Sequence, residues 1–489
     1  MRFDNSYAQL PEQFYARLAP TPVKMPTLIK LNVPLANDLD LNEAFLTSEE
    51  GIQVLAGNRV LTGSDPIAMA YGGHQFGGWV PQLGDGRAIL LGEVLDRNGK
   101  RFDIQLKGSG RTPFSRDGDG RAWLGPVLRE YVVSEAMAAL NIPTTRALAV
   151  VSSGETVVRE DYFPGAILTR VAQAHIRVGT FEFFAARNDV SSLNILADYV
   201  IERFYPEARD TVDPYLSLFK NVLAGQAALI AKWLGVGFIH GVMNTDNMSI
   251  AGETIDYGPC AFMDGYHPDT VFSYIDYRGR YAYANQPKIA KWNLASFAST
   301  VLPLIKSDKA KASEEMTEAL NTFDGIFATE RQSVFCAKLG LSPQEEGDTA
   351  LIKDLLNLMA EENADFTQTF RGLCDLPGTE EPPQTASVLD FFKDTGAFKA
   401  WESAWQARLR REPRSLQEIQ ANMRAVNPAY IPRNHRIEQM IAAALNGNFA
   451  PFERLNDVLS RPYDDQPAFA ELQAPPKPDE IVHQTFCGT

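Results

Sequence analysis

The segment that decides the fold reads His240-Gly-Val-Met-Asn-Thr-Asp-Asn247, and Asp256-Tyr-Gly258 follows it nine residues after Asn247. Asn247 and Asp256 are hard oxygen donors, and apolar residues stand on both sides of the turn Ala251-Gly-Glu253 between them. This pattern predicts a tight hairpin that returns the Asp256 carboxylate to the side of the Asn247 amide. The two groups would then share one Mg²⁺, which takes few protein ligands together with phosphate oxygens.

A catalytic loop that ends in Asn, followed by a hairpin and Asp-x-Gly, is the metal-binding half of a kinase-type site. One residue departs from that pattern, because Val242 stands where such enzymes have the Asp that receives the substrate proton. Asp246 is the nearest carboxylate that could replace it. Taken alone, the stretch is explained equally well as a surface loop with incidental acids, so the rest of the chain must decide.

Upstream, the chain has the order of a phosphate-binding N-terminal lobe. The loop Leu83-Gly-Asp-Gly-Arg87 precedes a strand pattern at 88–94, and a turn containing Asn98-Gly99 leads to a second strand pattern at 102–107. Two strand patterns around Asn-Gly predict a hairpin. The second strand ends in Lys107, in the place of the lysine that holds nucleotide phosphates in kinases.

A helix pattern at 126–140 supplies the expected partner of that lysine. It begins with Pro126, and Glu130 lies on it 23 residues after Lys107. Order and spacing favour a Lys107–Glu130 ion pair over the alternative, in which Glu130 is a solvated helix acid.

Two further features point to a buried anion, and a third indicates close approach of backbone. The run 108–121 combines four glycines with three arginines, as in a loop that closes on a phosphate. Arg170 and Arg177 stand where a protein kinase has its apolar adenine hinge, and phosphates in that slot would explain both. The run 71–78 holds four glycines around His74, which indicates that its backbone closely approaches a neighbouring group. His74 could be a ligand, but a lone histidine in a glycine-rich loop is more often structural, and we interpret it so.

Composition excludes several classes of protein. A net charge of −15 over 489 residues argues against broad nucleic-acid binding. The chain has no apolar stretch of membrane-spanning length and no signal-peptide pattern, so we expect a soluble cytoplasmic protein, most simply a monomer. No Cys-x-x-Cys pair occurs, which gives neither a zinc site nor a disulfide framework among Cys260, Cys336, Cys374 and Cys487.

We therefore expect an α+β, bilobal, protein-kinase-like fold with three parts. Residues 1–60 would form an N-terminal extension, and 61–310 the core, with an N-lobe at about 61–165 and a C-lobe at about 166–310. Residues 311–489 would form a mainly helical C-terminal extension that ends in a flexible tail. Within the core, 144–151 and 156–158 read as a strand pair around Ser152-Ser-Gly154.

Several motifs together resemble the selenoprotein O (YdiU) family over nearly the whole chain. They are Gly84-Asp-Gly-Arg, the run from Lys107 to Arg121, Arg129-Glu-Tyr, His240-Gly-Val-Met-Asn-Thr-Asp-Asn-Met and Asp256-Tyr-Gly-Pro. The resemblance implies a kinase-like fold that binds ATP in a flipped orientation. It also implies transfer of AMP, and not phosphate, to Ser, Thr or Tyr hydroxyls of proteins, including the enzyme itself. UMP transfer with Mn²⁺ is attributed to bacterial members.

Carried onto this sequence, the resemblance makes Asp246 the base and makes Asn247 and Asp256 the ligands of Mg²⁺ or Mn²⁺. It assigns nucleotide contacts to Gly84, Gly86, Arg87, Lys107, Asp119, Gly120, Arg170 and Arg177.

Family members also carry a selenocysteine or cysteine three residues from the C-terminus, where this chain has Cys487. In some bacterial members that residue pairs with a cysteine of the activation segment. The only cysteine there is Cys260, at a position that is not the usual one, so a redox switch and two unpaired thiols both stay open.

Two other functions remain as alternatives. A small-molecule or protein kinase would transfer the γ-phosphoryl group, although such enzymes normally keep the Asp that is replaced by Val242. A non-catalytic nucleotide-binding pseudokinase would have no need for both metal ligands together with Lys107 and Glu130.

Overall fold

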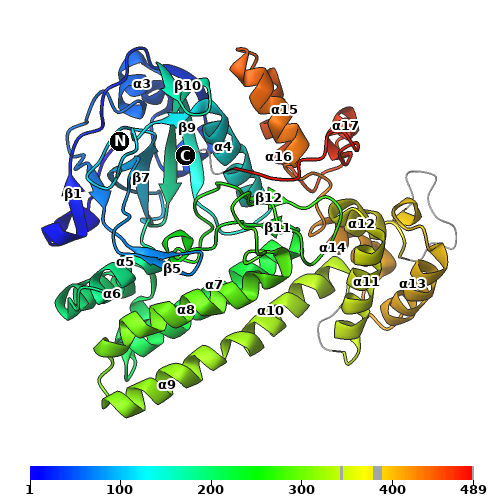
Figure 1. The fold of residues 1–489 in the computed structure, drawn as a ribbon. Helices are drawn as coiled ribbons and strands as arrows, with labels where there is room; N and C mark the ends of the chain where they lie inside the picture. Colours follow the sequence, from blue (N-terminus) through cyan, green and yellow to red (C-terminus); the bar gives the residue numbers. More distant parts are fainter. Residues whose placement is uncertain (342–344, 378–387, 487–489) are drawn as a thin grey trace.

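The computed structural model describes residues 1–341, 345–377 and 388–486, and its N-terminal half is built on one antiparallel sheet (Figure 1). The strand order is β1-β3-β6-β7-β10-β9-β2, and β8 pairs with β10. The strands are β1 (Tyr15–Arg17), β2 (Thr27–Leu31), β3 (Ile67–Met69), β6 (Ala88–Leu95), β7 (Arg101–Lys107), β8 (Ala122–Trp123), β9 (Arg146–Val158) and β10 (Tyr162–Ala172).

The β6–β7 hairpin forms as the Asn-Gly turn predicts, with Ala88 opposite Lys107. Its strands are covered on both faces, so Glu93 on β6 is buried although it is an acid. The Glu93 carboxylate accepts hydrogen bonds from the backbone N–H groups of Ser6 and Tyr7, at 2.9 and 2.6 Å. The N-terminal segment is thereby anchored to the sheet.

The prediction of a strand pair around Ser152-Ser-Gly154 is wrong. β9 runs through these residues as one strand, and its partner is β10, with Ser152 opposite Ala166. Gly154 has φ +66°, and a Cβ there would lie 2.7 Å from the Met25 side chain. The glycine therefore permits an irregularity inside one long strand, and the chain does not reverse its direction there.

Helix α4 (Leu124–Ala139) lies between the sheet and two helices from the far end of the chain, α15 (Asn434–Leu445) and α16 (Ala450–Leu459) (Figure 1). Most of its residues are buried, because both of its faces are covered. Arg129 on α4 donates to Asn434 Oδ1 at 3.1 Å and to the Cys260 carbonyl oxygen at 2.5 Å. One buried side chain therefore ties α4 both to the C-terminal extension and to the segment after Asp256.

Outside the main sheet the described residues form two short strand pairs, β4 (Gly73–Gln75) with β5 (Gly78–Val80), and β11 (Phe238–Ile239) with β12 (Ala261–Phe262). The second half of the chain is mainly helical. The remaining α-helices are α1 (Val33–Asp38), α2 (Glu43–Leu46), α3 (Glu49–Leu55), α5 (Val178–Ala185), α6 (Val190–Phe204), α7 (Pro214–Gly235), α8 (Gln286–Val301), α9 (Lys309–Asn321), α10 (Phe323–Lys338), α11 (Asp348–Glu362), α12 (Phe366–Leu373), α13 (Thr395–Leu409), α14 (Leu416–Arg424) and α17 (Ala470–Gln473).

The expected α+β fold class is confirmed. Within the described residues, none of the helices combines the length and the apolar character that crossing a bilayer requires. The tail, which we expected to be flexible, makes specific backbone contacts up to Thr485. Tyr274 donates its N–H to the Thr485 carbonyl at 3.1 Å, and Thr485 donates its own to Phe272 at 2.8 Å.

Candidate active site

A cavity of about 450 Å³ opens between the sheet and the helical half of the molecule. Its walls come from the loop before β6, the end of β7, the run 108–121, β10, the start of α5 and the two segments around Asn247 and Asp256. All the residues predicted as base, metal ligands or nucleotide contacts line it: Gly84, Gly86, Arg87, Lys107, Asp119, Gly120, Arg170, Arg177, Asp246, Asn247 and Asp256.

Charged side chains form a continuous network at the inner wall. Lys107 Nζ donates to Glu130 Oε2 at 2.5 Å, which is the pair that the sequence order predicts. Arg170 bridges Glu130 and Asp256, and its contact with Asp256 measures 2.5 Å. Arg177 lies 3.4 Å from the other oxygen of Asp256. Three buried cations thus converge on two carboxylates.

This convergence fixes the ionisation of the acids. Burial opposes the charge of Asp256, but Arg170, Arg177 and Lys107 outweigh it and hold its pKa well below the ordinary value. Burial likewise opposes the charge of Glu130, and Arg170 and Lys107 lower its pKa. Both carboxylates are therefore ionised at neutral pH.

The hairpin predicted between Asn247 and Asp256 does not form. The chain turns at Ser249 and Gly252, but Ser249 bridges to Arg177 and Thr254 bridges to Thr144, so the two limbs pair with other segments. Asp256 has φ +61°, a left-handed conformation that is unfavourable for a residue with a Cβ. Its network of arginines holds the backbone in that state.

Asp246 and Asn247 lie in a single 3₁₀ turn, Thr245–Asn247. The Asn247 amide donates to the Val242 carbonyl at 2.9 Å. Asp246 accepts a hydrogen bond from Gln75 at 3.0 Å on one oxygen, while its buried Oδ1 has no partner among the described residues. Burial raises the pKa of Asp246 to about 6, so this carboxyl group can exchange a proton near neutral pH.

The glycine-rich run that contains His74 forms the β4–β5 hairpin and packs on the catalytic loop. A Cβ at Gly73 would lie 3.1 Å from Asp246, which accounts for a glycine there. His74 donates its backbone N–H to Thr245 Oγ1 at 2.6 Å, and its Nδ1 lies 2.7 Å from the buried Glu182. His74 is therefore a structural residue, as we interpreted it.

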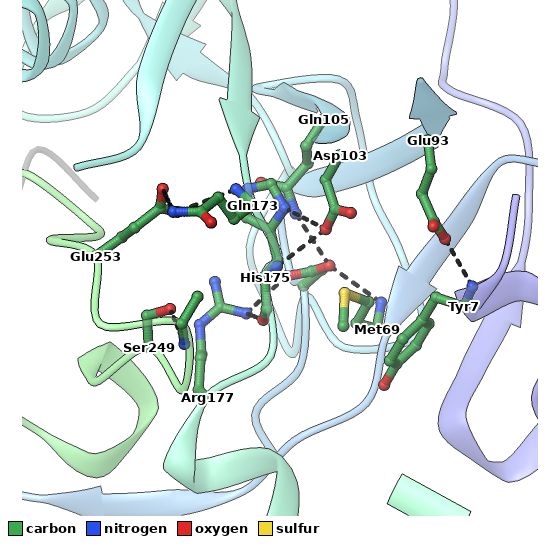
Figure 2. A network of polar contacts seen from close by, with 12 residues as sticks. Tyr7, Met69, Glu93, Asp103, Gln105, Gln173, His175, Arg177, Ser249 and Glu253 are labelled. Atoms are coloured by element: carbon green, nitrogen blue, oxygen red, sulfur yellow. Dashed lines mark hydrogen bonds and ion pairs between the residues drawn. The ribbon is translucent and has the colours of Figure 1, made fainter. Parts of the chain in front are cut away.

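Sequence reasoning missed Asp85, which stands behind Arg177. Its buried carboxylate accepts from the Met69 N–H at 3.1 Å and from Gln105 at 3.2 Å, and it lies 3.7 Å from Arg177. Figure 2 shows how Arg177 enters this network, donating to the carbonyl oxygen of His175. The only signal in the sequence was an acid between Gly84 and Gly86.

The run 108–121 folds over the cavity from the sheet side. Thr112 donates to the Asp85 carbonyl at 2.7 Å, and Gly110 pairs with Gly120 through the backbone at 3.0 Å. Asp119 is held by Arg159, at 2.8 and 2.9 Å, and this contact lowers its pKa.

Comparison with known proteins identifies the family. The family model described as "Protein adenylyltransferase SelO" matches residues 1–460. The chain belongs to the SelO family. Proteins named "Protein nucleotidyltransferase YdiU" are 60% identical over 488 residues in Rhodopseudomonas palustris and in a Bradyrhizobium species, and 58% identical over 492 residues in Methylorubrum populi. Each match covers 100% of this chain and 99% of the relative.

Membership of the SelO family confirms the enzyme class and the kinase-like character of the fold. The chain is a protein nucleotidyltransferase, so its substrates are a nucleotide and a protein. For Cys260 and Cys487 of this SelO protein, the sequence leaves both a redox switch and two unpaired thiols open, and Cys487 lies outside the described residues. Cys260 is fully buried, and burial raises its pKa to about 11, which disfavours a reactive thiolate.

Proposed function

We propose that this protein transfers AMP from ATP to Ser, Thr or Tyr hydroxyl groups of proteins, including its own chain, and releases pyrophosphate. One observation carries the proposal. Lys107, Arg170 and Arg177 place three buried cations at the inner wall of the cavity, beside the carboxylates of Glu130, Asp256 and Asp85. Over the whole lining, seven arginine and lysine side chains outnumber four aspartates, and this leaves positive charge for an anion. The phosphates of ATP would occupy that wall, and the adenine would lie toward the opening.

The donor set at Asn247 and Asp256 fits a divalent cation. Asp256 is an ionised oxygen donor, and a buried oxygen of the neighbouring Asp246 has no partner among the described residues. No group of three or more His, Cys, Asp or Glu side chains in the described ranges could hold a metal alone. Asn247 and Asp256 would therefore hold Mg²⁺ or Mn²⁺ together with phosphate oxygens, and the cation would withdraw charge from the phosphates.

The residues of the chain would divide the reaction among them. Lys107, fixed by Glu130, and the two arginines orient the triphosphate and stabilise its charge. The acceptor hydroxyl oxygen forms a bond to the α-phosphorus, the bond from that phosphorus to the bridging oxygen breaks, and pyrophosphate leaves. Asp246 takes the hydroxyl proton, for which its raised pKa suits it.

Incubation with ATP labelled separately at the α and γ positions tests this function. We expect α-label, and no γ-label, to become covalently attached to acceptor protein and to the enzyme itself. Parallel reactions with α-labelled UTP and either Mg²⁺ or Mn²⁺ would show whether UMP is also transferred. Attachment of γ-label alone would overturn the proposal in favour of a kinase, and nucleotide binding without attachment of either label would favour a pseudokinase.

A further inference from the structure

Exposed aromatic and aliphatic side chains gather on two short segments that meet in space. Tyr274, Ile275, Tyr277 and Phe486 are all exposed, with Tyr277 at 80%, and we call these four residues the mouth patch. The Tyr274 ring lies 5.0 Å from that of Phe486 and 6.2 Å from that of Tyr277. Scattered exposed apolar residues are ordinary, but a contiguous group marks a surface that binds something.

The mouth patch is continuous with the cavity. Ile275 lines the cavity together with Asp246 and Asn247. Tyr281, a few residues further along the same loop, donates to Asn244 of the catalytic loop at 2.6 Å. A molecule bound on the mouth patch would therefore lie beside the carboxyl group to which we assign the proton transfer.

The loop that presents the patch is held firmly in place. The buried Asp276, between Ile275 and Tyr277, accepts the backbone N–H groups of Arg280 at 2.9 Å and Tyr281 at 2.8 Å. The exposed rings thus project from an anchored turn, and little ordering entropy would be lost when a partner binds.

The same loop already binds an extended segment, because the tail of the chain pairs with it. Ser273 and Thr485 form a parallel bridge with the backbone hydrogen bonds described above, and Phe486 reaches the patch from this segment. The tail shows that the loop accepts a peptide in extended conformation with a large apolar side chain against Tyr274.

We propose that the mouth patch is the docking surface for the acceptor protein. It would bind an extended segment whose large apolar side chain packs against Tyr274, Ile275 and Tyr277, while a nearby hydroxyl residue enters the cavity at Asp246. The inference rests on the proposed function, since it names where that function receives its protein substrate.

Two fluorescein-labelled dodecapeptides test the docking surface. Both consist of Ala, Gly and Lys around a single central Thr. They differ at one position, two residues from the Thr, where one peptide has Phe and the other has Asn. We measure binding by fluorescence anisotropy with a saturating non-hydrolysable ATP analogue. Burying one large apolar side chain predicts that the Phe peptide binds about tenfold more tightly than the Asn peptide.

Three variants of the full chain locate that preference. Tyr277→Ala should remove most of the tenfold difference, and Phe486→Ala should remove part of it. Tyr162→Ala is the matched control, because Tyr162 is 76% exposed and lies outside the cavity lining. It should bind both peptides as the wild type does, and affinity for the ATP analogue should be unchanged in all three variants.

The outcomes separate the docking surface from the proposed function. Equal binding of the two peptides, or equal effects of Tyr277→Ala and Tyr162→Ala, overturns the docking surface even if α-label is still transferred to protein. A Phe preference that is lost in Tyr277→Ala supports it even if no label is transferred. A concentration-dependent dimer that Tyr277→Ala abolishes would show that a second copy covers the patch, and this would also overturn the proposal.

Discussion

Two buried lysines in this molecule have different kinds of partner. Lys107 in the cavity has Glu130 at 2.5 Å and Asp256 at 3.9 Å. Lys338 at the end of α10 lies over the rings of Phe370 and Phe366, at 4.3 and 5.6 Å, and among the described residues no carboxylate is within ion-pair distance of it. Burial lowers the pKa of Lys338 to about 7. Burial, Arg170 and Arg87 also lower the pKa of Lys107, but there Glu130 and Asp256 oppose the lowering.

This difference between the two lysines indicates the role of the carboxylates around the cavity. A lysine that only fills space in a helical core can lose its proton and remain buried. A lysine that must meet phosphates has to stay charged before they arrive, and this requires acids within a few ångströms. The lining of the cavity, with seven arginine and lysine side chains and four aspartates, has a surplus of positive charge that an anionic ligand would balance.

Removing the negative charge at the centre of the cavity should have the largest effect. Asp256→Asn keeps the shape of the side chain but leaves Arg170 and Arg177 without the carboxylate that they share. We expect AMP transfer to fall by at least about 100-fold, the scale of losing one electrostatic group aimed at the reacting centre. Rates with α-labelled ATP over a range of Mg²⁺ and Mn²⁺ concentrations measure this. A rate close to that of the wild type would show that Asp256 holds no metal.

The next effect is expected on the free energy of unfolding, because the buried acids also stabilise the folded cavity. Glu130→Gln leaves Lys107 and Arg170 buried without their shared partner, which should cost about 3–5 kcal/mol of unfolding free energy. Denaturant unfolding measures the loss. Glu135→Gln on the same helix is the control, with a smaller expected loss because its partner Arg146 is 30% exposed. Equal losses in the two variants would remove the distinction between a fully buried ion pair and a partly exposed one.

The smallest effect is expected at Lys338, the buried lysine that has no carboxylate partner among the described residues. Its pKa in the folded chain, about 7, is below its ordinary value near 10.5. The unfolded chain therefore binds more protons between these values, and Lys338 makes the protein more stable as pH rises through that window. Lys338→Met should remove this rise and should stabilise the protein at pH 7 by more than about 1.4 kcal/mol, the equivalent of one pKa unit. Thermal unfolding at several pH values would contradict this if the rise persisted.

The sequence predicted those parts of the site that local patterns encode. The Asn-Gly turn placed β6 and β7, and the spacing from Lys107 to Glu130 placed an ion pair between a strand and a helix. Glycines in 71–78 indicated a close approach of backbone, which the structure shows at Asp246. Each of these signals lies within a few residues or follows one fixed order of elements.

The rest depends on partners that are distant in the sequence. The hairpin expected after Asn247 fails because Arg177 and Thr144 compete for its two limbs. Ser152-Ser-Gly154 looks like a turn, but β2 and β10 flank this stretch of β9 and keep it extended. The position of Asp85 between two glycines did not reveal its role, because that role is defined by Arg177, which lies 92 positions later in the chain.

The clamp on α4 has a consequence for biosynthesis. Arg129 bonds to Asn434, which is made 305 residues later. At about 5–20 residues per second, a ribosome needs about 15–60 s to cover that distance. During this interval α4, which carries Glu130, packs against the sheet but lacks the contacts that α15 and α16 make with its other face. A chain released before residue 434 would contain every residue of the cavity wall and still lack the two helices that pack on α4. The time needed to complete synthesis therefore sets when the active site can be fully assembled.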